Sequence, residues 1–285
     1  AGTHEDRNPS CSLRSDQVWW CYQCHSGGSI FAAAEGLEGL PARGPEFITR
    51  TVPKLAEELG IPIPESESMD SDAWRRQKSL LVLSDAAKLL ASEGDRKHAQ
   101  ARGWSESTCQ ALGIGSFSCQ DFQEKLRSLG HSMEDAVRAD ITPLLFGDSK
   151  LTFTLRDNHG VPVGFASRDM NWNGQGPKYV NTSSEAKIYR KRSVLYNLHN
   201  MPHGSRVAIV VEGYACVASA WEQGVQHAVA CCSSNLCWEQ ACALHEAGVD
   251  HVILCLDHDP AGKQGTFKAL DEIFPRLPMT QVSVM

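Results

Sequence analysis

The chain has 285 residues, 42% of them hydrophobic and 21% charged, a composition ordinary for a globular protein with room for two hydrophobic cores. No apolar run reaches the roughly 18 residues of a membrane span, and no signal segment begins the chain, so we expect neither a membrane protein nor an exported one. The net charge of −7 does not indicate a nucleic-acid-binding protein, although a local basic patch can bind where the sum does not.

The cysteine content indicates a reducing compartment. The 11 cysteines are an odd number at irregular spacing and do not form the pattern of a disulfide framework. We therefore expect a cytoplasmic protein. The chain begins at Ala1 and ends at Met285 inside an apolar stretch, and we expect both ends to be cuts through a longer protein.

The amino-terminal part combines turn-forming residues with candidate metal ligands. Cys21 and Cys24 have a normal zinc-ligand spacing, and His4 is a third ligand type. The alternative is that both cysteines are packed thiols. Helical segments are expected at Ile30–Glu38 and at Glu46–Leu59, the second ending before a glycine.

A polar, acidic stretch over residues 64–72 is typical of a linker. A long helix is expected from about Ala73 to Ser92. Two short helices follow, and their amino-terminal signals are the capping residues Ser105 and Ser132.

Next come two expected strands, Lys150–Arg156 and Val161–Ser167, joined through the turn at residues 157–160 into a β-hairpin. From Phe146 to Arg206 the sign of the charge reverses, with nine lysines and arginines against four acidic residues. Charge alone leaves open whether this segment is a solvated face or a nucleic-acid-binding patch.

From Arg206 onward, apolar runs alternate with helical segments. Four strands are expected, at Val207–Val211, His227–Cys231, His251–Leu256 and Val282–Met285. The helices between them are expected at Ala215–Gln223, Leu236–Ala247 and Gly262–Ile273. This alternation predicts a parallel sheet covered on both faces, in which functional residues lie at the carboxyl ends of the strands.

Acidic residues follow two of these strands directly. Glu212 comes after the first strand, and Asp257 and Asp259 come after the third. Clustered carboxylates repel one another unless a cation neutralises them, and hard oxygen ligands suit Mg²⁺ or Mn²⁺. The alternative is that these residues are helix N-caps, since Asp259 precedes a proline.

The segments Val210–Tyr214 and Leu256–Gly262 resemble the Toprim domain, which DnaG-type primases, type IA and type II topoisomerases and some nucleases share. This resemblance implies that Glu212, Asp257 and Asp259 bind the catalytic metal ions, Mg²⁺ or Mn²⁺.

The preceding segments resemble the amino-terminal half of the DnaG polymerase domain. They are, in the family's order, Leu151–Asp157, Val163–Arg168, Pro177–Asn181 and Lys191 with Leu195-Tyr196. The resemblance implies that four residues contact template or nucleotide phosphates: Arg168, Lys178, Asn181 and Lys191. We expect Tyr179 and Tyr196 to be core or lining residues rather than stacking platforms.

Residues 4–10 and 20–24 resemble the zinc ribbon of these primases, which implies a Zn²⁺ site at His4, Cys21 and Cys24. The family's first ligand is a cysteine three residues before the histidine, and here that position is Ala1, so the fourth ligand is absent. Cys11 and His25 do not match the family's geometry as substitutes.

The chain also departs from the family at the expected metal site. Cys216 stands where primases have an aspartate, His258 where they have a glycine, and Ser233-Ser234 where they have Gly-Thr. These departures favour a divergent primase, of phage or mobile-element type.

The sequence therefore predicts an α/β chain, α+β overall, with four parts. These are a zinc-ribbon domain at 1–63, a linker and helix at 64–100, a mixed α+β polymerase subdomain at 101–204 and a Rossmann-like Toprim domain at 205–285. The predicted function is synthesis of short RNA primers on single-stranded DNA from ribonucleoside triphosphates, beside a replicative helicase whose binding domain lies outside this chain. The alternatives are another Toprim enzyme, such as a nuclease or topoisomerase, and an inactive module that binds single-stranded DNA.

Overall fold

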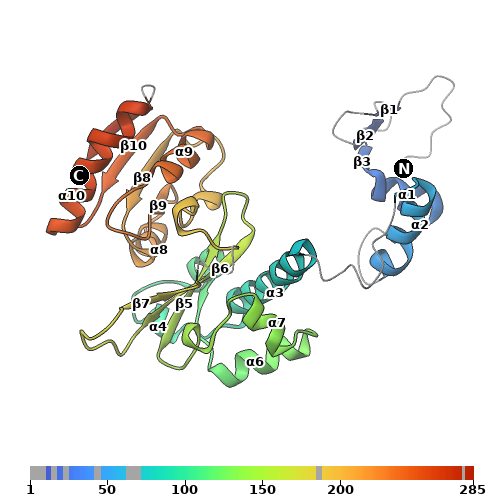
Figure 1. Cartoon of the computed structure of the whole chain (residues 1–285). Helices are drawn as coiled ribbons and strands as arrows, with labels where there is room; N and C mark the ends of the chain where they lie inside the picture. Colours follow the sequence, from blue (N-terminus) through green and yellow to red (C-terminus); the bar gives the residue numbers. More distant parts are fainter. Residues whose placement is uncertain are drawn as a thin grey trace. The chain divides into compact units, whose positions relative to one another are not determined.

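The computed structural model describes residues 11–13, 18–21, 26–41, 46–61, 72–183, 188–277 and 280–285. The chain forms two compact units, Ala1–Ser71 and Asp72–Met285 (Figure 1). Within the described residues, no helix combines the length and the apolar character needed to cross a bilayer.

The first unit contains a small antiparallel sheet and helices. Strands β1 (Cys11–Leu13), β2 (Val18–Cys21) and β3 (Ser26–Ser29) pair in that order. Helix α1 (Ile30–Glu38) matches its predicted bounds and ends at Gly39, whose φ of 65° is the left-handed conformation that favours glycine. The second predicted helix is confirmed as a π-turn, Phe47–Thr51, that continues into α2 (Val52–Glu58).

The second unit begins with the predicted long helix, α3 (Asp72–Glu93), which packs on α5 (Glu106–Leu112), α6 (Cys119–Ser128) and α7 (Met133–Arg138). The short α4 (Lys97–Gln100) follows it. The side chains of Ser105 and Ser132 accept hydrogen bonds from backbone N–H groups at the starts of α5 and α7, which confirms both predicted caps.

Arg96 is a buried cation that joins three elements. Its guanidinium donates to the carbonyls of Leu90 and Ala91 at the end of α3, to the carbonyl of Ile114 at 2.6 Å, and to the carboxylate of Glu106. One side chain thus satisfies carbonyls that the end of a helix leaves unpaired and ties that end to a strand.

A four-stranded antiparallel sheet lies beside these helices, in the order β4-β5-β6-β7. Its central pair, β5 (Lys150–Arg156) and β6 (Pro162–Asp169), is the predicted hairpin. The outer strands β4 (Ile114–Gly115) and β7 (Tyr179–Asn181) were not expected, because two or three residues carry no readable alternation.

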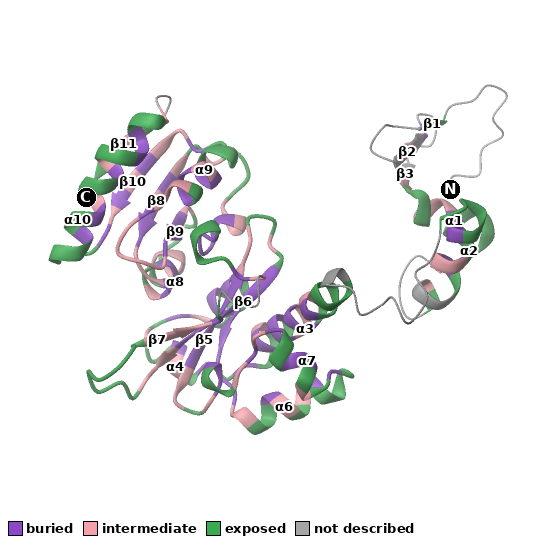
Figure 2. Ribbon diagram, in the orientation of Figure 1, coloured by how far each residue is buried: buried purple, intermediate pink, exposed green. Residues whose placement is uncertain are grey.

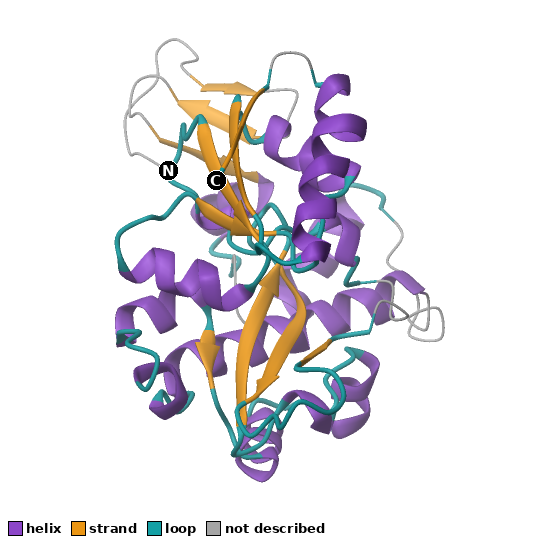
Figure 3. Cartoon of the chain, turned by 90° about the vertical axis from the view of Figure 1, so that its left-hand side faces the viewer, coloured by secondary structure: helices purple, strands orange, loops and turns teal. Residues whose placement is uncertain are grey.

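The remaining sheet is parallel throughout, in the order β11-β10-β8-β9. Strands β8 (Val207–Val211), β9 (Ala228–Ala230), β10 (His251–Cys255) and β11 (Gln281–Val284) alternate with α8 (Tyr214–Glu222), α9 (Trp238–Glu246) and α10 (Pro260–Lys268). The π-turn Ala269–Ile273 extends α10. The predicted α/β architecture is confirmed (Figure 3).

Both faces of this sheet are covered, as predicted. Alternate residues of β8 enter different cores: Ile209 and Val211 pack with α8, whereas Ala208 and Val210 pack with α9 and the π-turn after α10. In Figure 2 the buried colour accordingly lies on β8, β9 and β10, whereas the edge strand β11 is mostly exposed.

The parallel and antiparallel sheets of the second unit share one hydrophobic cluster. Phe153 of β5, Tyr196 and Tyr214 lie together in it, with Phe153 and Tyr214 ring centroids 5.4 Å apart. Ser105 at the start of α5 donates two hydrogen bonds to Glu222 at the end of α8. The two sheets therefore pack as parts of one body.

We predict that Arg96→Met lowers the free energy of unfolding by about 3 kcal/mol, because it leaves buried carbonyls without donors. Urea denaturation followed by circular dichroism measures the change. Arg127→Met on the exposed side of α6 is the matched control and should change stability by less than about 0.5 kcal/mol. Equal effects of the two substitutions would contradict this account of Arg96.

A second prediction concerns His199, whose Nδ1 is buried without a hydrogen-bond partner. Burial, together with the positive charge of Arg156, lowers the pKa of His199 to about 4. Between pH 6.5 and 4 the unfolded chain binds a proton that the folded chain does not, so stability falls as the pH falls through this window.

From pH 7 to pH 4.5 the wild type should therefore lose about 2 kcal/mol more stability than His199→Gln. Urea denaturation at both pH values tests this difference, with exposed His203→Gln as the control. An identical pH dependence in wild type and His199→Gln would refute it.

Candidate active site

The order of the parallel strands contains a topological switch point beside β8. From β8 the chain runs to β9 on one side and then returns to β10 on the other side of β8. At such a switch point the connections leave in opposite directions, which opens a crevice at the carboxyl ends of the two strands. Glu212 follows β8 and Asp257 closely follows β10, so both predicted residues lie at this switch point.

Glu212 and Asp257 are in direct contact. Oε1 of Glu212 accepts a hydrogen bond from the backbone N–H of Asp257 at 3.1 Å. Burial raises the pKa of Glu212; that hydrogen bond opposes the rise, and the negative charges of Asp257 and Asp259 add to it. A Cβ at Gly262 would lie 2.1 Å from the carbonyl oxygen of Asp257 and 2.7 Å from Glu212 Oε1, so only glycine fits there.

Asp259 has the capping role that the sequence left open as an alternative. Its Oδ1 accepts from the N–H of Gly262 at 2.8 Å, and Pro260 is the first residue of α10. Within the part of the chain that the structure describes, no three His, Cys, Asp or Glu side chains are gathered as metal ligands. The donor set is nevertheless hard and mutually repelling, which suits a divalent cation after side-chain rotation.

Cys216 adds a thiol to this edge of the sheet. Burial raises the pKa of Cys216, and the charges of Asp257 and Glu212 raise it further. The third residue of α8 is therefore a neutral thiol beside the carboxylates and contributes no charge to the site.

Arg168 and Arg102 bring two positive charges together at the antiparallel sheet. The Arg168 guanidinium lies 5.6 Å from the centre of the Tyr179 ring and donates to its hydroxyl. Burial lowers the pKa of Arg102, and the positive charge of Arg168 lowers it further. Arg102 Nε is also buried without a partner. Two adjacent guanidiniums with an unused donor are suited to an anion such as phosphate.

Arg102 is not among the site residues that the motifs indicate, although it lies in the Arg-Gly-Trp segment ahead of α5. The signal that identifies it is spatial. Its interaction with Arg168 of β6 arises only from the tertiary fold, and spacing along the chain does not report it.

Asn181 connects the two sheets. Its Oδ1 accepts a hydrogen bond, 3.0 Å long, from the hydroxyl of Tyr214. Tyr214 lies two residues after Glu212 in the chain. Tyr179, Tyr196 and Tyr214 belong to the shared hydrophobic cluster, so the expectation that Tyr179 and Tyr196 are core or lining residues is confirmed. The strand with the basic residues and the turn with the carboxylate are thereby fixed to one another.

Lys178 and Lys191 take different positions around this arrangement. Alternation along β7 puts Lys178 with Val180 on the face opposite to Tyr179 and Asn181, and its ammonium lies over Trp172. Lys191 is exposed in the 3₁₀ turn Lys191–Ser193. Burial raises the pKa of Cys232 to about 12 and the charge of Lys191 opposes this, so Lys191 lies near the end of β9.

The turn with Lys191 is anchored by a buried amide. Gln240 of α9 donates to the carbonyls of Val194 and Cys231 at 2.9 and 3.1 Å. Lys191 is therefore carried by a fixed segment at the carboxyl edge of the parallel sheet. Arg192 beside it is engaged in an ion pair with Glu239.

The candidate zinc ligands are described only in part. Cys21 is buried at the end of β2, and the strand register puts Cys11 directly opposite it. Directly opposite residues extend to the same face of a sheet. His4 and Cys24 lie outside the described residues.

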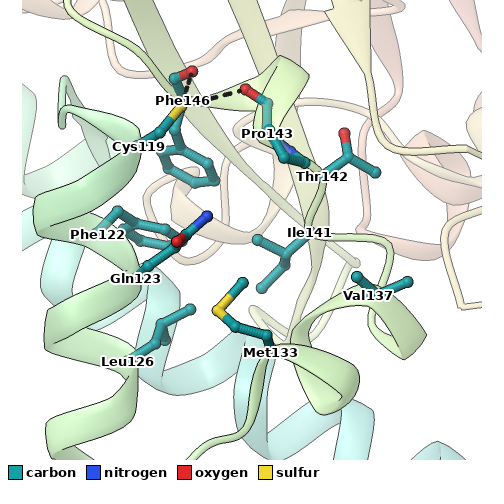
Figure 4. Close-up of a pocket in the computed structure, with 10 residues that line it drawn as sticks. All are labelled: Cys119, Phe122, Gln123, Leu126, Met133, Val137, Ile141, Thr142, Pro143 and Phe146. Atoms are coloured by element: carbon teal, nitrogen blue, oxygen red, sulfur yellow. Dashed lines mark hydrogen bonds between the residues drawn. The ribbon is translucent and has the colours of Figure 1, made fainter.

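A separate apolar hollow lies between α6 and α7 (Figure 4). It holds about 60 Å³, well under the roughly 150 Å³ of an apolar cavity that accommodates benzene. The Cys119 thiol at its edge is bonded to the carbonyls of Pro143 and Phe146. Its lining is mostly apolar and contains no charged side chain that could act as a catalytic acid or base.

Comparison with known proteins matches both halves of the second unit. Residues 86–202 match the model of the DNA primase catalytic core, N-terminal domain, and residues 206–284 match that of the Toprim domain. DNA primases of Halalkalibacterium halodurans and Geobacillus stearothermophilus are 28% and 29% identical to the chain, over 94% and 95% of it. The alignments cover 47% and 48% of those proteins, so the chain spans about half of their length.

Solved primase structures share the fold. The zinc-binding and RNA polymerase domains of Aquifex aeolicus primase match with a TM-score of 0.63 at 19% identity, covering 100% of this chain and 70% of that one. A DnaG primase catalytic domain bound to single-stranded DNA matches at 0.60 and 23% identity, covering 75% and 72%. The chain thus matches a DNA primase catalytic-core N-terminal domain followed directly by a Toprim domain, which is the pattern of a DnaG-type primase fragment.

Proposed function

We propose that this chain is the polymerising part of a DNA primase, a DNA-directed RNA polymerase that makes short RNA primers on single-stranded DNA. The observation that carries the proposal is the joining of Glu212 and Asp257 at the sheet's switch point to the Arg102–Arg168 pair through Tyr214 and Asn181. Carboxylates for cations and guanidiniums for phosphates, held on one body, are what nucleotidyl transfer needs.

Glu212, Asp257 and Asp259 would hold Mg²⁺ or Mn²⁺, and their hard oxygens and mutual repulsion support this assignment. The bound ions would supply the charge that activates a ribonucleotide 3′-hydroxyl and stabilises the incoming triphosphate. Asp259 uses one carboxylate oxygen in its cap and keeps the other, so it can turn toward a cation without leaving α10.

The basic residues would bind the two polyanions, template and triphosphate. Arg102 and Arg168 present paired guanidiniums to a phosphate, and Lys191 presents a point charge at the edge where the carboxylates lie. Asn181 has an amide NH₂ to donate while its oxygen holds Tyr214. Lys178 would contact template on the other side of β7.

The proposed partners are single-stranded DNA, ribonucleoside triphosphates and a replicative helicase, the last by resemblance alone. One structural neighbour is a primase catalytic domain bound to single-stranded DNA, which supports a DNA template. Zinc is proposed at His4, Cys21 and Cys24, and the zinc-binding domain of the Aquifex aeolicus neighbour supports it.

The second candidate is a module that binds single-stranded DNA without catalysing polymerisation. Two observations favour it: Asp259 is engaged as a helix cap, and Cys216 brings no charge to the carboxylates. This candidate and the primase differ in product formation and not in DNA binding.

We predict that the double substitution Asp257→Asn, Asp259→Asn lowers RNA primer synthesis on the order of 100-fold or more, because two metal-binding charges are lost. Asparagine is also a good N-cap, so α10 should stay folded. Primer synthesis is measured as incorporation of labelled ribonucleotides on single-stranded DNA with Mg²⁺ or Mn²⁺. DNA binding is measured by fluorescence anisotropy.

Asp271→Asn, exposed in the π-turn after α10, is the matched control and should leave synthesis unchanged. Primer synthesis that survives in the double variant would remove the metal assignment. DNA binding with no product from the wild type, both alone and in a chain extended at both ends, would favour the non-catalytic module.

For the zinc site, we predict about one Zn²⁺ per chain by elemental analysis and almost none in Cys21→Ser, since thiolate ligands dominate such sites. Cys11→Ser tests whether the cysteine opposite Cys21 serves as the missing fourth ligand. Cys242→Ser on α9 is the control. Unchanged zinc content in Cys21→Ser would contradict the site.

A further inference from the structure

The connection between β6 and β7 carries an exposed tryptophan that the active site does not use. Trp172 retains 42% of its accessible surface and belongs to none of the buried clusters formed by the described residues. The connection projects from the end of the antiparallel sheet in Figure 1. An indole in this position contributes little to folding.

The ring is nevertheless held in place. Trp172 Nε1 donates to the carbonyl of Gly176 at 3.1 Å, across a loop in which Gly174 and Gly176 have φ values of 95° and 70°. At the start of the loop the N–H of Asn171 bonds to Asp169 Oδ1 at 2.9 Å. Because these contacts order the indole in advance, a ligand that stacks on it meets a smaller entropic penalty.

A cation accompanies the ring. The ammonium of Lys178 lies 5.7 Å from the centre of the Trp172 ring. Asp169 at the end of β6 lies opposite Lys178, which precedes β7. Its carboxylate already forms an ion pair with Lys150, at 2.7 Å. Among the described carboxylates, none forms an ion pair with Lys178. The loop therefore presents an aromatic surface beside a positive charge that pairs with no carboxylate of the described residues.

We propose that Trp172 and Lys178 form a binding site for one nucleotide of a single strand, in which an unstacked base lies on the indole and a phosphate meets Lys178. Every base has a π-face, so such stacking tolerates any sequence, and a neighbouring lysine neutralises the backbone. The inference rests on the proposed function, since it assumes that single-stranded nucleic acid passes the antiparallel sheet.

The position of Trp172 and Lys178 relative to β6 and β7 supports this role. Arg168 and Tyr179 are directly opposed residues of β6 and β7, and Lys178 immediately precedes Tyr179. Lys178 lies on the other face of β7 from Tyr179 and Arg168, and β7 is the edge strand of its sheet, so a single strand with one phosphate at Arg168 would pass over this edge to reach the loop. DNA template and RNA product both present this chemistry, and the two are separated by measuring both.

The test uses the full chain and fluorescence anisotropy with labelled oligo(dT) and oligo(rU) of about 12 nucleotides. Trp172→Ala should weaken binding of the strand that stacks by roughly 5- to 150-fold, the range for one lost base–aromatic stack. Trp172→Phe should restore most of the affinity. Trp74→Ala on α3, which removes another indole of 40% exposure, should change nothing.

Salt dependence separates the two residues. Lys178→Gln should reduce the slope of log affinity against log salt by about 0.7, the value for one phosphate on a single strand, whereas Trp172→Ala should leave the slope unchanged. A 2-aminopurine base in the oligonucleotide should lose fluorescence on binding to wild type, and lose less on binding to Trp172→Ala, because stacking quenches it.

A loss of oligo(dT) affinity alone assigns the site to template, and a loss of oligo(rU) affinity alone assigns it to product. If Trp172→Ala binds both as tightly as Trp74→Ala while Arg168→Gln binds weakly, the stacking site is wrong and the proposed function survives. If the wild type binds neither oligonucleotide, both proposals are wrong.

Discussion

The packing of Tyr214 between two sheets is the constraint on which the rest of the second unit depends. Its ring contacts Phe153 from the antiparallel sheet and Tyr196 from the connecting segment, with centroids 5.4 and 5.2 Å away. Because Tyr214 is the first residue of α8 and stands two residues after Glu212, this contact fixes where the carboxylate leaves the sheet. Its hydroxyl, bonded to Asn181, fixes β7 by the same side chain. Acidic and basic groups are therefore positioned by one hydrophobic cluster.

The second unit contains a cluster of carboxylates and a pair of guanidiniums, and in each the like charges repel one another. Carboxylates at adjacent strand ends raise the pKa of Glu212, and adjacent guanidiniums lower the pKa of Arg102, in both cases after burial as the larger cause. Neither arrangement stabilises the fold, and perturbed groups of this kind gather at functional sites. A bound divalent cation would relieve the first repulsion, and a bound phosphate would relieve the second. A metal–nucleotide complex contains both, which is why the pattern supports nucleotidyl transfer more strongly than DNA binding alone.

The strands of the parallel sheet could be predicted from the sequence to within about one residue, because β8, β9 and β10 are apolar runs and β11 alternates apolar with polar residues. The β5–β6 hairpin could also be predicted, because the turn at residues 157–160 marks it in the sequence. Strands β4 and β7 were not, since two or three residues are defined by pairing with β5 and β6 rather than by their own pattern. Among the candidate site residues, the positions of Glu212 and Asp257 at the carboxyl ends of strands could be read from the sequence. The interaction of Arg102 with Arg168 and the position of Lys178 on the other face of β7 could not be predicted, because both depend on tertiary packing.

Asp259 shows why a capping role and a metal-binding role need not exclude one another. As an N-cap it is worth about 1 kcal/mol, because one oxygen satisfies one backbone N–H. A divalent ion would interact with the full charge of the carboxylate, a larger contribution to the free energy than one hydrogen bond. On the proposed metal role, the cap would act as a resting contact that keeps the side chain at the amino end of α10 in the absence of a cation. Aspartate and asparagine are nearly equal as caps and very unequal as metal ligands, so the charge of Asp259 is not explained by capping alone.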